Sequence, residues 1–150
     1  MLKVYNSISH NKEEFIPIKD KQVNMYVCGV TVYDLCHLGH ARAYVVFDII
    51  RRALKFLGYQ VKYIQNFTDV DDKILDRANQ NKIDPSLLTE EMIKEYFTDM
   101  DALNINRADA YPRVTGMIKE IILFIEELVA KGFAYQIKGD VYFDISKFKD

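Results

Sequence analysis

The chain has 150 residues, 49% of them hydrophobic and 28% charged, and its 20 basic and 22 acidic side chains give a net charge of −2. These values are ordinary for one globular domain, and they exclude a disordered chain, a collagen-like repeat and a polybasic nucleic-acid tail. Two cysteines cannot form a disulfide scaffold, and no apolar run reaches the roughly 20 residues that span a bilayer. The charged N-terminus lacks the apolar stretch of a secretory signal. We therefore expect a cytoplasmic protein that does not bind membranes.

The first half of the chain predicts a strand, a helix and a second strand. Residues 23–29 are rich in β-formers and end at a glycine, which indicates a buried strand that leads into a loop. Residues 41–57 have the spacing of an amphipathic helix, which Gly58 would end. Residues 60–67 alternate between polar and apolar side chains, as a half-buried strand does. Such lengths predict a βαβ unit with a parallel strand pair and a right-handed crossover.

The predicted helix has one apolar and one polar face. We expect the core to be contacted by Val46, Ile49, Ile50, Ala53 and Leu57, and the opposite face to carry Asp48, Arg51, Arg52 and Lys55. Together with Arg42, the basic residues of this face are either solvated or in contact with RNA. Solvation is the favoured interpretation, because phosphate-driven binding needs several charges clustered on one surface.

Three more helices and a hairpin are predicted in the second half. A short helix over 71–80 has an acidic start that suits the helix dipole, formed by Asp69, Asp71 and Asp72. Asp84-Pro85 predicts the N-cap and first residue of a helix that extends to about 103. A third amphipathic helix is expected over 114–131. Residues 133–137 and 141–145 then flank a three-residue, glycine-containing turn, which is typical of a β-hairpin.

Two of the three histidines lie where a parallel α/β sheet binds its ligands. His37 and His40 flank Leu38-Gly39, between the first strand and its helix. At this edge of a sheet a helix N-terminus offers backbone N–H groups and a partial positive charge to phosphate. Two imidazoles there can donate hydrogen bonds to phosphoryl oxygens, and Gly39 lets a ligand approach the backbone. The alternative is that the histidines only cap and solvate the helix start.

The cysteines Cys28 and Cys36, with the two histidines, make up a Cys₂His₂ set that suggests zinc. The spacing contains neither C-x₂-C nor H-x₃₋₅-H, so we do not expect a zinc site formed wholly by this chain. By residue type alone, each cysteine is a small buried hydrophobe. Thr68 follows the second predicted strand and should face the same crevice as Cys28, unless it is an ordinary hydroxyl at a helix start.

Residues 25–40, Met-Tyr-Val-Cys-Gly-Val-Thr-Val-Tyr-Asp-Leu-Cys-His-Leu-Gly-His, closely resemble the signature region of the cysteinyl-tRNA synthetases, which are class I aminoacyl-tRNA synthetases. Segments 66–74, 97–105, 111–115 and 139–144 are also similar to that family, in the same order. His-x-Gly-His alone is typical of the superfamily. Its position just after Cys-Gly-x-Thr-Val-Tyr-Asp is specific to this family and one close relative.

The resemblance implies an α/β protein with the Rossmann-type, HUP-like parallel sheet and flanking helices of class I synthetases. Residues 1–110 would be the N-terminal half of the catalytic domain, and residues 111–150 a helix and β-hairpin that lead into the connective insertion. The family's Lys-Met-Ser-Lys loop, second Rossmann half and anticodon-binding region have no counterpart in this sequence. The chain thus looks like an N-terminal portion, which we expect to be inactive alone.

The activity implied by the resemblance is ATP-dependent activation of L-cysteine to cysteinyl adenylate, with release of pyrophosphate, then transfer to the 3′ end of cysteine tRNA. ATP would bind with magnesium, and the complete enzyme would be a monomer. The ATP signature would comprise His37, Leu38, Gly39 and His40. Its two imidazoles would be catalytic by stabilising the α-phosphate, and Gly39 would make room for the adenosine.

The resemblance also implies a zinc ion and a cysteine pocket. Cys28 matches the family's zinc-ligand cysteine, whose metal takes the substrate thiolate, and the other ligands would lie outside this chain. Such a bond would select cysteine over serine, because a hydroxyl binds zinc weakly and stays protonated at neutral pH. Cys28, Gly29, Thr31 and Thr68 would line the substrate pocket.

Two alternatives stay open. The related ligase that joins activated cysteine to an amino sugar in thiol-cofactor synthesis shares the zinc cysteine and His-x-Gly-His, and the identity of the acceptor would separate the two. A non-catalytic paralogue would instead bind nucleotide or RNA, or pair with another protein through its open sheet edge. ATP binding without cysteine-dependent turnover would favour that paralogue.

Overall fold

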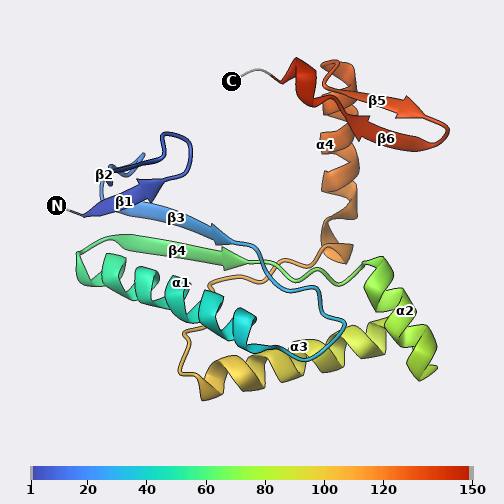
Figure 1. Cartoon of the computed structure of the whole chain (residues 1–150), viewed down its shortest axis with the longest axis horizontal. Coiled ribbons are helices and arrows are strands. Elements are labelled where there is room, and N and C mark those ends of the chain that lie inside the picture. Colours follow the sequence, from blue (N-terminus) through green and yellow to red (C-terminus); the bar gives the residue numbers. More distant parts are fainter. Residues whose placement is uncertain (1, 149–150) are drawn as a thin grey trace.

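The computed structural model describes residues 2–148, and its centre is a parallel strand pair covered on one face by helices (Figure 1). Strands β3 (Gln22–Val27) and β4 (Gln60–Gln65) pair in parallel along their whole length. Helix α1 (Leu38–Phe56) connects them and packs against β4. The predicted βαβ unit is therefore confirmed, with a helix that begins three residues earlier than expected.

A short segment, for which the sequence pattern predicts no strand, extends this sheet on the side of β4 that faces away from β3. The Gln65 N–H donates to the Ala110 carbonyl at 3.2 Å, and the Phe67 N–H donates to the Pro112 carbonyl at 2.9 Å. These bonds make isolated parallel bridges rather than a regular strand. The pairing continues beyond residue 110, so the chain up to about residue 113 contributes to the sheet.

Two capped helices follow β4, as predicted. Helix α2 (Asp72–Asn81) begins after Asp71, whose side chain accepts a hydrogen bond from the Lys73 N–H. Helix α3 (Pro85–Ala102) begins after Asp84, with proline at the first helical position. Both caps satisfy backbone donors that a helix start leaves without partners.

The core lies between the strand pair, α1 and α3, and it contains a buried polar chain. Gln65, only 2% exposed, accepts from the Tyr63 hydroxyl at 3.1 Å and donates to the Tyr96 hydroxyl at 2.7 Å. Burial raises the pKa of Tyr63 to about 12, so its phenol stays protonated at neutral pH. Apolar core residues around this chain include Val27, Tyr44, Phe67, Ile74, Leu88, Ile93 and Met100.

The prediction of which face of α1 packs in the core, and which faces solvent, is wrong. Asp48 and Arg51 are buried, at 6% and 4% exposure, whereas the apolar face expected in the core is partly open to solvent. In the described part of the chain Ile49 is 58% exposed, and the other residues of that face are also classed as exposed: Val46, Ile50, Ala53 and Leu57. The expectation of solvated side chains holds for Arg42 and Lys55 and fails for Arg51.

Arg51 is buried because the segment after α3 crosses α1 and presents acceptors to it. The Arg51 guanidinium donates to the Arg107 carbonyl at 2.5 Å and pairs with the Asp109 carboxylate at 2.8 Å. Asp109 in turn accepts from the Tyr63 N–H at 2.6 Å, which connects the pair to β4. Next to them, Asp48 pairs with the half-exposed Arg52. The polar face of α1 therefore binds another part of the fold.

The C-terminal part is a helix with a small hairpin. One 3₁₀ turn (Thr115–Met117) precedes α4 (Ile118–Ala130), and β5 (Ala134–Ile137) pairs antiparallel with β6 (Asp140–Phe143) before a last 3₁₀ turn (Ile145–Lys147). The hairpin is confirmed, but its loop has two residues instead of three. Both loop residues, Lys138 and Gly139, have positive φ, as a type I′ turn requires.

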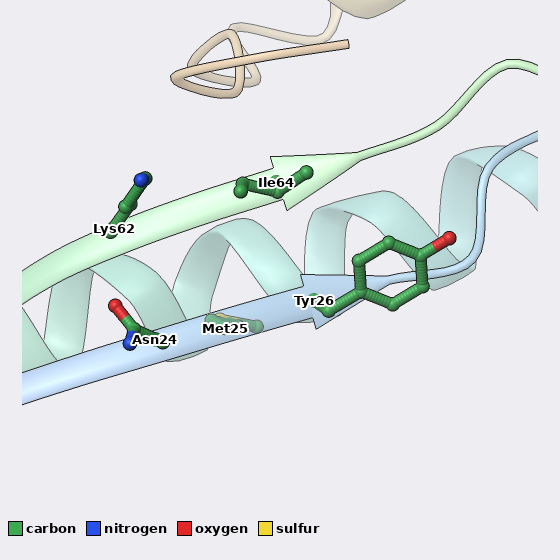
Figure 2. Close-up of a pocket in the computed structure, with 5 residues that line it drawn as sticks. All are labelled: Asn24, Met25, Tyr26, Lys62 and Ile64. Carbon is green, nitrogen blue, oxygen red and sulfur yellow. The ribbon is translucent and has the colours of Figure 1, made fainter. Parts of the chain in front are cut away.

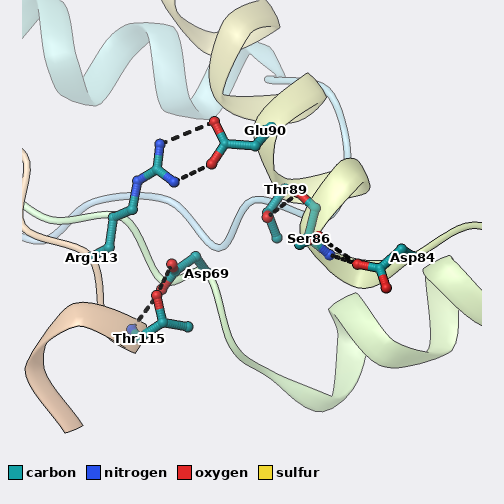
Figure 3. Close-up of polar contacts among 7 residues, drawn as sticks. All are labelled: Asp69, Asp84, Ser86, Thr89, Glu90, Arg113 and Thr115. Carbon is teal, nitrogen blue, oxygen red and sulfur yellow. Dashed lines mark hydrogen bonds and ion pairs between the residues drawn. The ribbon is translucent and has the colours of Figure 1, made fainter.

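Polar contacts fasten the start of this C-terminal part to the rest of the chain (Figure 3). Arg113 forms a two-pronged ion pair with Glu90 of α3. The Asp69 carboxylate accepts from the Thr115 N–H at 3.0 Å and also from the Thr115 hydroxyl. Asp69 thus bonds to the turn before α4, and the acidic start of α2 consists of Asp71 and Asp72.

The N-terminus forms a hairpin that the sequence did not predict. Strands β1 (Lys3–Asn6) and β2 (Asn11–Glu14) pair antiparallel as a separate two-stranded sheet that precedes β3 in the chain (Figure 1). Within residues 2–148, no helix combines the length and apolar character needed to cross a membrane.

Candidate active site

An open cavity of 520 Å³ lies at the carboxyl end of β3, where the loop that follows the strand meets the start of α1. Four of the predicted site residues line it, Gly29, Thr31, His37 and His40. Its other lining residues are Val30, Tyr33, Asp34, Leu35, Cys36 and Lys73. The cavity therefore has the position at which open parallel sheets bind ligands.

The two histidines form the first turn of α1. His37 is the N-cap residue, and its Nδ1 accepts from the Gly39 N–H at 3.0 Å. The Nδ1 of His40 accepts from the His37 N–H at 3.2 Å, which completes a reciprocal capping box. The ring centroids lie 3.9 Å apart. The capping role that the sequence offered as an alternative is thus present.

These bonds determine which nitrogen of each neutral ring carries the proton. A backbone N–H can only donate, so Nδ1 of His37 and of His40 must be the unprotonated acceptor. Each Nε2 then carries hydrogen and can donate to a ligand. Burial, together with the neighbouring His37, lowers the pKa of His40 below its ordinary value, which favours the neutral form.

Gly39 has a local reason to be glycine. A β-carbon at this position would lie 2.7 Å from Cε1 and 2.9 Å from Nδ1 of the His37 ring. Any larger residue would therefore displace the capping imidazole. The preceding residue, Leu38, is the first of α1; it is 85% exposed and does not line the cavity.

The strand ends bring the other predicted residues close together. Thr31, in the loop after β3, forms a parallel bridge with Thr68, in the segment after β4. Cys28 is exposed, and its backbone carbonyl accepts from the Tyr44 hydroxyl of α1 at 3.4 Å. Cys28 and Thr68 do not line the cavity themselves. Cys28 directly precedes the lining residue Gly29 in the chain, and Thr68 pairs with the lining residue Thr31.

Asn66 connects these residues, and the sequence analysis did not single it out. Its Oδ1 accepts from the Gly29 N–H at 2.9 Å and from the Tyr26 hydroxyl at 2.8 Å, and its Nδ2 donates to Thr68 Oγ1 at 3.3 Å. The available signal was its place, because Asn66 is a polar residue near the end of the strand predicted over 60–67, at the ligand-binding edge of the sheet.

Cys28 has a donor atom suited to zinc but no companion ligands among the described residues. Across residues 2–148, no three or more His, Cys, Asp or Glu side chains gather in an arrangement that could hold a metal ion. Because zinc sites need three or four protein ligands, the described residues do not fit a zinc centre by themselves. Cys36 is half-buried, and burial raises the pKa of its thiol to about 11.

A smaller hollow of 220 Å³ lies on the β3–β4 pair and has none of the predicted site residues in its lining (Figure 2). It is lined by Asn24, Met25, Tyr26, Lys62 and Ile64. These side chains offer one cation and no cluster of catalytic groups. The chemistry-bearing side chains lie around the larger cavity.

A parallel βαβ unit with two histidines at the start of its helix is the arrangement expected for a class I synthetase catalytic domain. The family described as "tRNA synthetases class I (C) catalytic domain" matches residues 14–150, and the chain belongs to this family.

Named relatives agree with this family. A "Cysteine--tRNA ligase" of Clostridioides difficile (strain 630) is 52% identical over 99% of this chain and 32% of its own length. Ligases of the same name from Methanococcus maripaludis (strain C6 / ATCC BAA-1332) and Endomicrobium trichonymphae are 54% and 56% identical, over 100% and 99% of this chain and 32% of each relative. The chain thus spans about a third of the length of these curated relatives.

Among solved structures, Mycobacterium tuberculosis methionyl-tRNA synthetase in complex with methionyl-adenylate superposes with a TM-score of 0.66. The match covers 75% of this chain and 23% of that enzyme, at 22% sequence identity. It confirms the expected α/β fold of class I synthetases.

Proposed function

We propose that this chain is the N-terminal portion of a cysteine–tRNA ligase, which activates L-cysteine with ATP and transfers it to cysteine tRNA. The observation that carries the proposal is the pair of Nε2–H donors of His37 and His40 at the cavity, within a chain more than half identical to proteins of that name. Residues 1–110 would form half of the catalytic domain, and residues 111–150 would lead into the connective insertion.

The proposed mechanism assigns the two imidazoles to the α-phosphate of ATP. Attack of the cysteine carboxylate on this phosphorus forms the adenylate, breaks the bond to pyrophosphate and increases charge on the nonbridging oxygens. Neutral rings whose Nε2–H groups are already oriented by backbone bonds stabilise that charge without reorganisation. The start of α1 adds its partial positive charge. Magnesium would accompany ATP as part of the substrate.

Gly29, Thr31 and Thr68 are proposed to line the cysteine pocket beside Cys28. We also propose Cys28 as one zinc ligand, with the remaining ligands supplied by parts of the longer protein outside this chain. When bound, zinc would supply selectivity for a thiolate over a hydroxyl. The described residues neither form this metal centre nor define its geometry, so the roles derived from the structure concern the chain's own donors.

Cysteine-dependent ATP–pyrophosphate exchange tests the proposal. The full-length protein that contains this chain should exchange with cysteine and not with serine, whereas the 150-residue chain with added zinc should stay at the blank. Replacing His40 with asparagine should lower kcat about 100-fold, the size expected for one transition-state donor, and leave the KM for cysteine unchanged. Absence of exchange by the full-length protein would refute the proposed activity.

Cys28→Ser in the full-length protein should abolish zinc retention and the preference for cysteine over serine together. A variant that keeps its normal preference would exclude Cys28 from the metal site. Charging of cysteine tRNA, rather than ligation to an amino sugar, then identifies the acceptor.

A further inference from the structure

Asn66 contacts both strand ends of the candidate site at once. Its side-chain oxygen accepts from the Gly29 N–H, and its own backbone carbonyl oxygen lies only 1.5 Å from where a β-carbon of Gly29 would be. Its amide nitrogen donates to Thr68 Oγ1. A single residue at the end of β4 thus fixes the loop after β3 and the hydroxyl of Thr68.

The orientation of the Asn66 amide follows from its partners. Gly29 offers an N–H, which can only donate, so the atom 2.9 Å away must be the side-chain oxygen. The other end of the amide is therefore the NH₂ group, and it faces Thr68 at 3.3 Å. Thr68 Oγ1 is an acceptor in this contact, which leaves its hydroxyl hydrogen for a ligand.

We propose that Asn66 is a positioning residue that makes Thr68 a hydrogen-bond donor to the carboxylate of the amino-acid substrate. A carboxylate oxygen can only accept, whereas the substrate's ammonium group can only donate. A hydroxyl whose lone pair is already engaged by an N–H, and whose hydrogen is free, is suited to the carboxylate. Asn66 acts through Thr68, and this inference rests on the proposed function.

The Gly29 N–H is engaged by Asn66, so Gly29 contributes space and shape to the pocket rather than a donor. Tyr26 supplies the second donor to the same oxygen from the end of β3, where Figure 2 shows its hydroxyl extending beyond the strand. Tyr26 thereby helps to hold the amide in this orientation.

The decisive substitution is Asn66→Asp in the full-length protein. A carboxylate keeps the acceptor for Gly29 and Tyr26 but has no N–H, so Thr68 must turn its hydrogen toward it. We expect the KM for cysteine in pyrophosphate exchange to rise at least tenfold, with the KM for ATP unchanged. Asn24→Asp, the same substitution at an exposed position of β3, is the matched control and should leave both constants unchanged.

A double-mutant cycle separates this role from simple charge repulsion. Thr68→Val should raise the KM for cysteine about tenfold, and Thr68→Ser should restore it to within about threefold of the unsubstituted protein. Once Thr68→Val is present, Asn66→Asp should have no further effect, because the hydroxyl it acts through is absent. An effect that persists in that background would overturn the proposal.

Cysteamine, which is cysteine without its carboxylate, provides an independent test. Asn66→Asp should weaken competitive inhibition by cysteamine less than about twofold, while it weakens cysteine binding at least tenfold. Equal losses for both ligands would show that Asn66 shapes the whole pocket, and a normal KM for cysteine would show that it does not orient Thr68. Either result overturns this inference while the proposed function stands, whereas an inactive unsubstituted protein refutes both.

Discussion

Arg51 provides a sharp test of how α1 packs, because the sequence pattern and the structure assign this side chain opposite surroundings. The pattern places Arg51 in solvent and Ile49 in the core, while the structure has Arg51 4% exposed and Ile49 58% exposed. Arg51→Ala should therefore be costly and Ile49→Ala nearly neutral. The reverse is expected if the helix buries its apolar face.

The magnitude follows from the contacts that would be lost. Arg51→Ala removes the ion pair with Asp109 and the bond to the Arg107 carbonyl, both at the edge of the core. Breaking a buried ion pair costs about 3–5 kcal/mol, and we expect about 3 kcal/mol because the Asp109 side chain is 43% exposed. For a chain of this length that lowers Tm by roughly 6–12 °C.

Urea unfolding of the 150-residue chain, followed by circular dichroism, measures this difference directly. Arg42→Ala is the matched control on the same helix, since Arg42 is exposed, and it should change the unfolding free energy by less than about 0.5 kcal/mol. Ile49→Ala should fall in the same range. A cost below about 1 kcal/mol for Arg51→Ala, or a larger cost for Ile49→Ala, would refute the packing described for α1.

Three further outcomes are expected from the site. Gly39→Ala should displace the His37 ring, cost about 1 kcal/mol through the lost helix cap and lower exchange activity, as unfolding and kinetics would show. In NMR titrations His40 should titrate below the ordinary histidine pKa. Because folding lowers this pKa, His40 contributes to stability at pH values above its pKa in the unfolded chain. That contribution is lost as the pH falls through its pKa in the folded chain. At pH 8 iodoacetamide should modify the exposed Cys28 well before Cys36. The reason is that a pKa of about 11 leaves only about one Cys36 thiol in a thousand ionised. Equal rates of modification, measured by mass spectrometry, would contradict the burial of Cys36.

The elements that the sequence predicted well are those whose signals are local. Alternation over β4, the Asp84-Pro85 start of α3 and the Gly-containing turn before β6 each depend on a few neighbouring residues. The two faces of α1 depend on distant partners instead. The pairing of Arg51 with Asp109, 58 residues further along the chain, has no local signal, and a hydrophobicity pattern assigns arginine to solvent by default.

The same distinction applies to the candidate site. Residue types and their order were enough to select His37, His40 and Thr68 as candidates, because histidine and threonine near a strand end suggest chemistry by themselves. The directions of their hydrogen bonds were not predictable. The ring nitrogen of each histidine that is free to donate to a ligand depends on nearby backbone N–H groups. Those groups reach their positions only when the capped helix forms.

Asn66 shows why contact direction matters for mechanism. A threonine hydroxyl can donate or accept, so its presence in a pocket is compatible with either end of an amino acid. The amide of Asn66 removes this ambiguity, since its oxygen is held by Gly29 and its nitrogen must then face Thr68. Asparagine is therefore specified here by both ends of its amide, and aspartate, which differs by one group, would reverse the donor. That reversal makes Asn66→Asp more informative than any truncation of the same side chain.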